Sequence, residues 1–401
     1  MRILVRVHSL GIGGSQINAV DLAGAVRDLG HQVMVFAQHG PLEERVERRG
    51  LRFIPAGDHP PRSLRAIGEL TRAGRSIKAD LIHAYEYYPS LESFYGPHAL
   101  AGIPMVATVL AMTVPRFLPR SVSLVVGTEA LALESRSTRR GPVLLVEPPI
   151  DTHEDTPDID ASIAASFRSH LGIDGQPTIV VVSRLTREMK LESVEAAIEA
   201  VASLHPAVPA RLVVVGTGDA FELIAARAEA VNDRLGQRAI VVAGPMLDPK
   251  PAYAVADVVV GMGSSAIRGM AFAKPVVVVG ERGFCELVSP ATIEGFLAEG
   301  FYGVGGGGNA APALASHLET LLSDAGRRTK LGEFGLALVR ERYDLASAAK
   351  RLERFYRGVV ARGPDYAGVM EDTVSIGLRI GWEATKVLMG RVTGRTGVER
   401  A

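Results

Sequence analysis

The sequence predicts two α/β domains, each built on a mostly parallel sheet with helices on both faces. Three observations lead to this prediction. Short β-branched runs alternate with longer amphipathic segments, the alternation stops at a proline- and acid-rich stretch, and it then restarts. The length of 401 residues also suits two or three domains. We therefore expect Rossmann-like domains at residues 1–150 and 151–365, with residues 366–401 packing back on the first.

The first domain is expected to contain strands at the runs RILVRV, QVMVFA, LRFIP, DLIHA, PMVATVL and SLVVG. Between the first two lies SQINAVDLAGAVRDLGH, whose apolar residues fall mostly on one helical face. Ser15 is expected to cap this helix and Gly30 to end it. A strand, a helix and a second strand in this order predict parallel pairing of the two strands.

A linker is predicted at PPIDTHEDTPDIDAS, residues 148–162, because prolines and acidic residues are concentrated there. Its acidic residues are Asp151, Glu154, Asp155, Asp158 and Asp160. After it, strands are expected at TIVVVSRL, RLVVVGTGD, AIVVAG, ADVVVG and KPVVVVG. The run GVGGGGNAAP from Gly303 is expected to be a flexible loop, residues 313–362 to be terminal helices, and the tail from Val374 to Gly390 to be helical.

The composition excludes several classes of protein. Lys and Arg number 44 and Asp and Glu number 44, and this balance argues against a general nucleic-acid binder. The single cysteine, Cys285, excludes an internal disulfide and is typical of a reducing cytoplasm. The most apolar stretch, residues 99–114, is shorter than the roughly 20 residues that cross a bilayer. We expect a cytoplasmic protein without an integral membrane segment, and a homodimer is compatible with these features.

Three motifs follow predicted strands, and the first is HSLGIGGSQ, residues 8–16. Glycines let backbone amides approach an anion, and the N-terminus of the following helix favours negative charge. The spacing of Gly11, Gly13 and Gly14 is not that of the dinucleotide-binding fingerprint, because the third glycine comes too early. The alternative is a glycine turn that is needed only for tight packing.

The second and third motifs supply cations and backbone amides. In SRLTREMK, Arg184 lies just past a buried strand and Lys190 begins a helix, and a guanidinium fork with an ammonium suits a diphosphate. In VVGMGSSAIRG, a strand breaks at Gly261, and the amides up to Ser265 are expected to form a nest at the next helix. Ser264 or Ser265 is expected to cap that helix. The alternatives are a solvated charged helix start and an ordinary serine cap.

Together, the order and spacing of these motifs resemble the family-4 retaining glycosyltransferases of the GT-B fold, over residues 1–362. LGIGGSQINAVDLA is similar to that family's opening glycine loop, and SRLTREMK to the motif whose Arg and Lys hold the donor diphosphate. The resemblance implies that a UDP- or GDP-linked sugar is bound mainly by the C-terminal domain, in the interdomain cleft. It implies an acceptor bound mainly by the N-terminal domain, transfer with retention, and no cofactor or metal, because cations and helix dipoles stabilise the leaving diphosphate. A small-molecule acceptor is expected rather than a lipid, because the N-terminal domain has no clear basic cluster.

With this resemblance, the candidate site residues form two groups, one for the donor and one for the acceptor. The donor-binding candidates are Gly13, Gly14, Arg184, Lys190, Gly216, Gly261, Met262, Gly263, Ser264, Ser265 and Arg268. The catalytic candidates are Arg184, Lys190 and Glu286, the last matching a glutamate that the family often keeps near the donor. The acceptor-binding candidates are His83, Tyr85 and Glu86.

The sequence departs from the family's pattern at functional positions. The family usually has two glutamates eight residues apart, and the corresponding residues are Val260 and Arg268. Its two usual histidines correspond to Leu110 and Tyr85. Arg268 cannot accept hydrogen bonds from a ribose, because a guanidinium only donates, so we expect it to bind a phosphate or an acidic group.

The function expected from these features is sugar transfer with a non-standard donor or acceptor. Two alternatives stay open. The first is a non-catalytic accessory protein that binds a nucleotide sugar. The second is a different chemistry on the same fold, such as epimerisation of a sugar nucleotide, because a fold does not determine a function.

Overall fold

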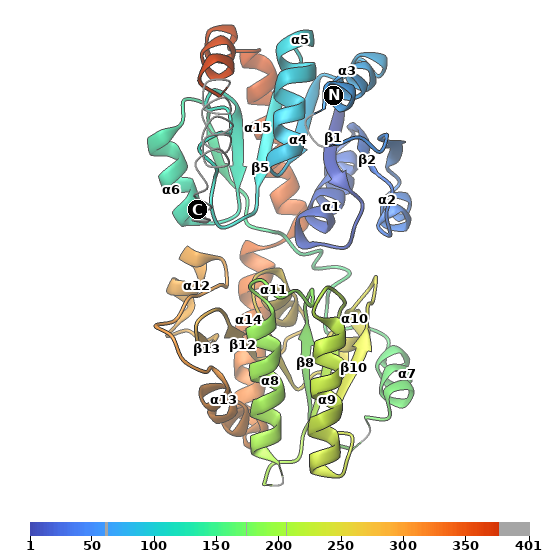
Figure 1. Cartoon of the computed structure of the whole chain (residues 1–401), viewed down its shortest axis with the longest axis vertical. Coiled ribbons are helices and arrows are strands. Elements are labelled where there is room, and N and C mark those ends of the chain that lie inside the picture. The colour runs from blue at the N-terminus through green and yellow to red at the C-terminus, as the bar shows by residue number, and fades with distance from the viewer. Residues whose placement is uncertain (61–62, 174, 206, 377–401) are drawn as a thin grey trace, which may run out of the picture. The chain divides into compact units, whose positions relative to one another are not determined.

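The structure is a computed structural model and describes residues 1–60, 63–173, 175–205 and 207–376. The chain divides into two compact units (Figure 1). The N-terminal unit comprises residues 1–127, 131–146 and the described residues from 349 onward, and the C-terminal unit comprises residues 128–130 and 147–348. The chain thus returns to the N-terminal unit within helix α15 (Leu345–Arg362), earlier than the boundary expected after residue 365.

The N-terminal unit contains a seven-stranded parallel sheet in the order β3-β2-β1-β4-β5-β6-β7. Its strands are β1 (Arg2–Ser9), β2 (Gln32–Gln38), β3 (Arg52–Pro55), β4 (Leu81–Tyr85), β5 (Met105–Val109), β6 (Ser123–Val126) and β7 (Val143–Leu145). Its helices are α1 (Gly14–Asp28), α2 (Glu43–Arg48), α3 (Leu64–Ser76), α4 (Tyr87–Ser93), the π-helical turn η1 (Phe94–His98), α5 (Ala99–Ala101), α6 (Glu129–Thr138) and α15. All six expected strands are present, and β7 is an additional edge strand.

Helix α15 belongs to the N-terminal core because a buried polar network ties it to the sheet. Tyr356 of α15 is buried, and its hydroxyl is hydrogen-bonded to Nδ1 of His83 on β4 at 2.5 Å. The other ring nitrogen of His83 lies 2.6 Å from Oγ1 of Thr108 on β5. Buried polar groups need such partners, so the helix that carries Tyr356 is fixed on this sheet.

The helix at residues 366–376 also packs on the N-terminal unit. Val369 lies in its core, and the buried Asp372 accepts hydrogen bonds from the backbone and hydroxyl of Ser121, both at 2.7 Å, and from Arg140 at 2.9 Å. Of the predicted tail helix, only residues 374–376 are described, and they are helical. The rest of that prediction lies outside the described residues. No helix in the described ranges is long and apolar enough to span a membrane.

The C-terminal unit contains a six-stranded sheet in the order β10-β9-β8-β11-β12-β13, parallel except for β13. Its strands are β8 (Thr178–Val182), β9 (Arg211–Val215), β10 (Ile240–Gly244), β11 (Val258–Gly261), β12 (Val276–Val279) and β13 (Cys285–Leu287). Its helices are α7 (Ala161–Leu171), α8 (Leu191–Leu204), α9 (Phe221–Leu235), α10 (Lys250–Val255), α11 (Ser264–Ala271), α12 (Ile293–Glu299), α13 (Ala311–Ser323) and α14 (Ala325–Arg342).

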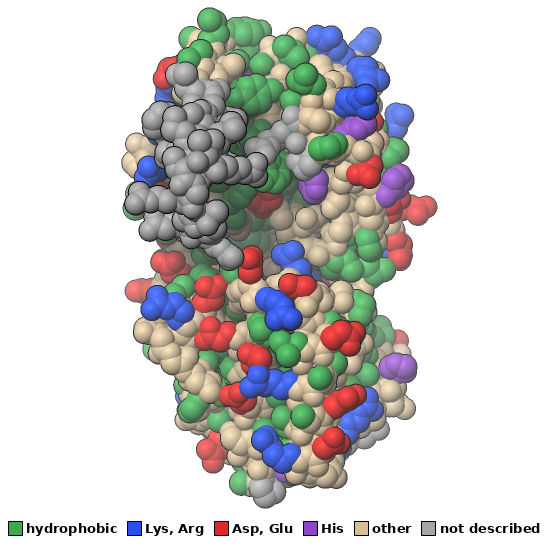
Figure 2. Space-filling model, viewed as in Figure 1, with side chains coloured by type: hydrophobic (Ala, Val, Ile, Leu, Met, Phe, Trp, Pro, Cys, Tyr) green, Lys and Arg blue, Asp and Glu red, His purple; other side chains and the backbone are tan. Residues whose placement is uncertain are grey.

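The central strands of this sheet are buried on both faces, which explains their continuous valine runs. Along β11, Val258 and Val260 pack in the core with α8, α9 and α13, whereas Val259 packs in the opposite core with α10 and α11. Val260 is therefore a core residue, and a glutamate at its place would be directed into an apolar cluster in this structure. On the face of this unit shown in Figure 2, acidic and basic side chains are interspersed.

The glycine-rich segment 303–308 is a loop, and backbone hydrogen bonds join it to the chain that follows β12. Gly280 and Gly303 approach so closely that a Cβ on Gly280 would lie 2.0 Å from the Gly303 carbonyl oxygen. Glu281 donates its N–H to the same carbonyl at 3.0 Å and accepts from the N–H of Gly305 at 2.8 Å. Gly280 and Gly305 are needed here because each packs directly against the backbone of the other segment.

Candidate nucleotide-binding and acceptor sites

The strand order of the C-terminal sheet reverses between β8 and β11. From β8 the sheet continues to β9 and β10 on one side, and from β11 it continues to β12 on the other. Ligands of open α/β sheets bind outside the carboxyl ends of the strands at such a point. Arg184 follows the end of β8 by two residues, and the turn Gly261–Ser265 begins at the end of β11. Two of the three predicted motifs therefore lie at this edge.

Gly216, at the end of β9, holds the segment that carries Arg184. Its φ is +146°, and a Cβ there would lie 1.8 Å from the carbonyl oxygen of Ser183. Backbone hydrogen bonds join the two segments, from Ser183 N to Val215 O and from Leu185 N to Thr217 O, both at 3.0 Å. Gly216 thus acts through the backbone, as the support of the Arg184 segment.

We expect Gly216→Ala to lower the affinity for a nucleoside diphosphate by more than about tenfold, because the new Cβ would displace the Ser183 backbone and with it Arg184. Calorimetric titration with UDP measures the effect. Gly236→Ala is the matched control, since Gly236 also has a positive φ, of +64°, but a Cβ there meets no atom within 4 Å. Equal loss of affinity in both variants would assign the effect to backbone strain in general.

Lys190 and Arg184 concentrate positive charge at the same edge. Lys190 is the half-buried residue at the start of α8, and Arg184 is exposed. Burial, and after it the charge of Arg184, lower the pKa of Lys190 from 10.5 to about 8, while Glu281 opposes the shift. Two cations that destabilise each other in the absence of an anion are expected where an anion binds.

Affinity for a nucleoside diphosphate is expected to fall as the pH rises through about 8, because Lys190 then loses its charge. A bound diphosphate favours the ammonium form and raises the pKa of Lys190, so binding above pH 8 is expected to take up protons. Titration with UDP in two buffers of different ionisation enthalpy measures that uptake. Lys190→Met is expected to abolish it, and uptake unchanged in this variant would place the titrating group elsewhere.

The turn after β11 differs in detail from the predicted amide nest. The N–H of Gly263 is already used, because it donates to the Phe301 carbonyl at 2.8 Å. Gly263, with φ +57°, precedes the first turn of α11, and the hydroxyl of Ser265 donates to the Val182 carbonyl at 2.7 Å. Neither serine therefore caps the helix with its side chain. The backbone amides of the first helical turn, starting at Ser264, are the donors that a helix leaves without an intrahelical acceptor.

Arg268 is held by a carboxylate of the predicted linker. Its Nε lies 2.8 Å from Oδ2 of Asp155, and both side chains are largely buried. The composition predicts an exposed linker. Asp155 is only 5% exposed, so this prediction does not hold for the whole segment. Burial raises the pKa of Asp155, whereas Arg268 lowers it. Arg268 therefore has an anionic partner within this unit, through its Nε, and its predicted role in binding a phosphate or an acidic group stays a prediction.

Glu281, rather than the predicted Glu286, is the carboxylate whose charge acts on Lys190. Glu286 lies on the edge strand β13 and pairs with Val278 of β12. There, burial and the charge of Glu286 raise the pKa of the Cys285 thiol to about 12. Glu281 follows the end of β12 by two residues, a position that the sequence motifs do not single out. Its place just after a predicted strand is the sequence feature that could have identified it as a site candidate.

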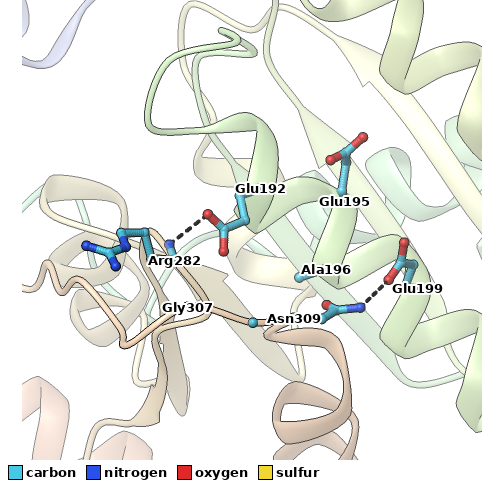
Figure 3. Close-up of a pocket in the computed structure, with 8 residues that line it drawn as sticks. Glu192, Glu195, Ala196, Glu199, Arg282, Gly307 and Asn309 are labelled. Atoms are coloured by element: carbon cyan, nitrogen blue, oxygen red, sulfur yellow. Dashed lines mark hydrogen bonds between the residues drawn. The ribbon is translucent and has the colours of Figure 1, made fainter. Parts of the chain in front are cut away.

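A clamp from α8 fixes the chain next to Glu281. Both oxygens of Glu192 accept backbone hydrogen bonds, one from Arg282 at 2.8 Å, drawn in Figure 3, and the other from Gly283 at 2.6 Å. Farther along α8, Glu199 accepts from the side-chain amide of Asn309 at 2.9 Å. The contacts of Glu192 join the beginning of α8, which follows Lys190 directly, to the turn after Glu281.

The order of the N-terminal sheet reverses between β1 and β4, and the remaining candidates lie within β4 or in the segments that follow these two strands. His83 and Tyr85 are within β4 and are each only 1% exposed. Burial lowers the pKa of His83 to about 3, so the ring is neutral. In this structure neither side chain is accessible to an acceptor, and the predicted contact is corrected to a role in the core.

Glu86, the third acceptor candidate, meets the glycine loop. Its Oε1 accepts a hydrogen bond from the Ser15 hydroxyl at 2.8 Å and from the Leu110 N–H at 3.2 Å. The predicted cap of α1 is wrong, because Gly13 is the N-cap residue and Ser15 lies within the first turn. The Ser15 hydroxyl is thereby directed to Glu86, and the carboxylate lies at the point where the strand order reverses.

Comparison with known proteins gives matches over both units. The model of Glycosyltransferase Family 4 matches residues 12–125, and that of Glycosyl transferases group 1 matches residues 176–324. No curated protein sequence matches the chain.

Among solved structures, a glycosyltransferase from Rickettsia africae is similar, with a TM-score of 0.72 and 16% identity over 90% of this chain and 98% of that one. HepE from Anabaena, solved in complex with UDP-glucose, has a TM-score of 0.72 and 16% identity over 89% of this chain and 100% of that one. WaaG, a glycosyltransferase involved in lipopolysaccharide biosynthesis, has a TM-score of 0.62 and 15% identity over 89% and 100%. At these identities the likeness shows the fold, and the family models add the family. The chain therefore belongs to the glycosyltransferases of family 4 and group 1 and has their GT-B fold.

Proposed function

We propose that the protein transfers a sugar from a UDP- or GDP-linked donor to a small-molecule acceptor, with retention of configuration and without a metal. Arg184 and Lys190 bind the donor diphosphate, and the first-turn amides of α11 and the Gly261–Ser265 turn contact the β-phosphate and the sugar. Gly13 and Gly14 approach the reacting groups, and Glu86 binds the acceptor. The donor or the acceptor is non-standard, because Val260 and Arg268 stand where the family usually has glutamates.

The observation that carries this proposal is the pair of cations at the carboxyl edge of the C-terminal sheet. Lys190 is half-buried next to the charge of Arg184, and this lowers the pKa of its ammonium group. Such a pair lowers the free energy of unfolding when no anion is bound, because the two positive charges repel each other and one of them is partly buried. The same two cations and the N-terminus of α11 supply the charge that stabilises a leaving diphosphate, which supports transfer without a metal. The UDP-glucose complex of the Anabaena relative supports a nucleotide-sugar donor.

A non-catalytic accessory protein that binds a nucleotide sugar is the second candidate. It is favoured by the side chains at the two altered positions, since Val260 packs in the core and Arg268 is paired with Asp155. Neither offers a carboxylate to the donor. On this account the cations still bind a diphosphate, and turnover is absent.

A turnover screen separates these two functions. The purified protein is incubated with UDP-, GDP-, ADP- and dTDP-linked sugars, with pooled small-molecule acceptors, and release of the nucleoside diphosphate is measured. Acceptor-dependent release from one nucleotide class supports the transferase. Binding of a nucleotide sugar with no release in any pool would favour the accessory protein, and conversion of the donor without an acceptor would indicate epimerisation.

A further inference from the structure

Glu86 has a backbone conformation that residues other than glycine rarely adopt. Its φ is 66° and its ψ is −174°, in a region that is essentially restricted to glycine. The surroundings impose this conformation, because the Glu86 N–H donates to Thr108 O at 2.7 Å and its carbonyl accepts from Ser90 N at 3.2 Å. A glycine would satisfy the same backbone bonds with less strain.

The side chain of Glu86 also costs stability. Burial raises the pKa of its carboxyl group, although the bonds from Ser15 and Leu110 lower it. Both of those bonds end on Oε1. In the part of the chain that the structure describes, Oε2 has no hydrogen-bond partner. Glu86 thus combines a strained backbone, an unfavourably buried carboxylate and a carboxylate oxygen without a hydrogen-bond donor. Such features are concentrated at functional sites.

We propose that Oε2 of Glu86 accepts a hydrogen bond from a hydroxyl of the acceptor, and that the acceptor is a neutral polyol. This inference rests on the proposed transferase function and names its acceptor class. The bonds from Ser15 and Leu110 fix Oε1 and so set the direction of Oε2. A carboxylate accepts hydrogen bonds from hydroxyl groups and repels a phosphate, so the position of Glu86 disfavours a phosphorylated acceptor at the same place.

Unfolding of Glu86 variants tests whether the residue is kept for binding or for the fold. Glu86→Gly and Glu86→Ala both remove the carboxylate and differ only in their backbone preference. The unfolding equilibrium constant of the glycine variant is expected to be lower than that of the alanine variant by about threefold to thirtyfold. Glu86→Gln, which keeps an acceptor oxygen for Ser15 and Leu110, is expected to be at least as stable as the natural protein. A glutamine variant that is tenfold less stable would show that the charged carboxylate holds the fold, and the proposal would fall.

Transfer assays test the acceptor class in the same full-length variants. Neutral polyols and their monophosphates are supplied in separate pools with the donor. Transfer to the neutral pool is expected, with a loss of about a hundredfold in Glu86→Gln and partial recovery in Glu86→Asp, while UDP affinity stays unchanged. Transfer to the phosphorylated pool alone, or equal turnover in Glu86→Gln, would overturn the proposal. Absence of nucleotide binding in the natural protein would instead refute the transferase function, and the unfolding comparison would still decide the role of Glu86.

Discussion

Arg184→Ala is expected to lower kcat/KM for the nucleotide-sugar donor by about a hundredfold to a thousandfold. The guanidinium supplies charge-assisted hydrogen bonds to a diphosphate whose charge grows as the sugar leaves, and alanine cannot supply this two-pronged geometry. Lys190→Ala is expected to have a loss of similar size. Steady-state measurement of nucleotide release gives both values.

Arg187→Ala is the matched control for this prediction. Arg187 is exposed in the same segment and is connected to the rest of the unit by its backbone N–H, which donates to Asp219 at 3.2 Å. We expect this variant to keep its activity, and exposed substitutions of this kind change the free energy of unfolding by less than about 0.5 kcal/mol. Equal losses in Arg184→Ala and Arg187→Ala would show that the segment has only a general electrostatic effect.

Glu92→Ala is expected to reduce the free energy of unfolding by about 3–5 kcal/mol, because it leaves a buried guanidinium without its anionic partner. Arg6 of β1 is only 4% exposed, and its Nε and Nη2 donate to Glu92 of α4 at 3.1 and 2.7 Å. The guanidinium also lies 5.2 Å from the ring centre of Phe36. A loss of this size is a large part of a domain's total stability of about 5–15 kcal/mol. Urea unfolding followed by circular dichroism measures it.

Two further variants identify the cause of that loss. The double variant Arg6→Met, Glu92→Leu is expected to recover most of the stability, because a buried ion pair is often replaced by apolar residues at little cost. Glu44→Ala removes an exposed pair with Arg48, whose charged atoms are 3.8 Å apart, and is expected to change the free energy by less than about 0.5 kcal/mol. If the double variant is as unstable as Glu92→Ala, lost packing rather than the unpaired charge explains the effect.

The sheets could be predicted because their strands carry long β-branched runs, whereas β7 and β13 could not. Each of these two strands has three residues, and in β13 the charged Glu286 interrupts the apolar pattern that would indicate a buried strand. His83 and Tyr85 were misassigned for a related reason. The polar side chains of His83 and Tyr85 suggest that the strand has ended before them. In the structure β4 continues through Tyr85, and both residues are buried because both faces of the sheet are covered.

The candidate site was predictable where its residues follow strands directly and not where it depends on distant partners. Arg184 and Lys190 lie near a strand end, so local sequence places them. The pairing of Arg268 with Asp155 joins positions 113 residues apart, and no local pattern indicates it. At Ser15, a small error in the predicted start of helix α1 changes the role of the side chain. The N-cap residue, Gly13, lies two residues earlier than the predicted cap, and the hydroxyl of Ser15 is thereby directed to Glu86.

A calorimetric titration tests whether the C-terminal unit binds a nucleoside diphosphate through Arg184 and Lys190. UDP, GDP, ADP and dTDP are each added to the natural protein, to Arg184→Ala and to Arg187→Ala. We expect micromolar binding of at least one nucleotide, which is lost in Arg184→Ala and kept in Arg187→Ala. No binding of any of the four, or equal binding by all three proteins, would contradict it.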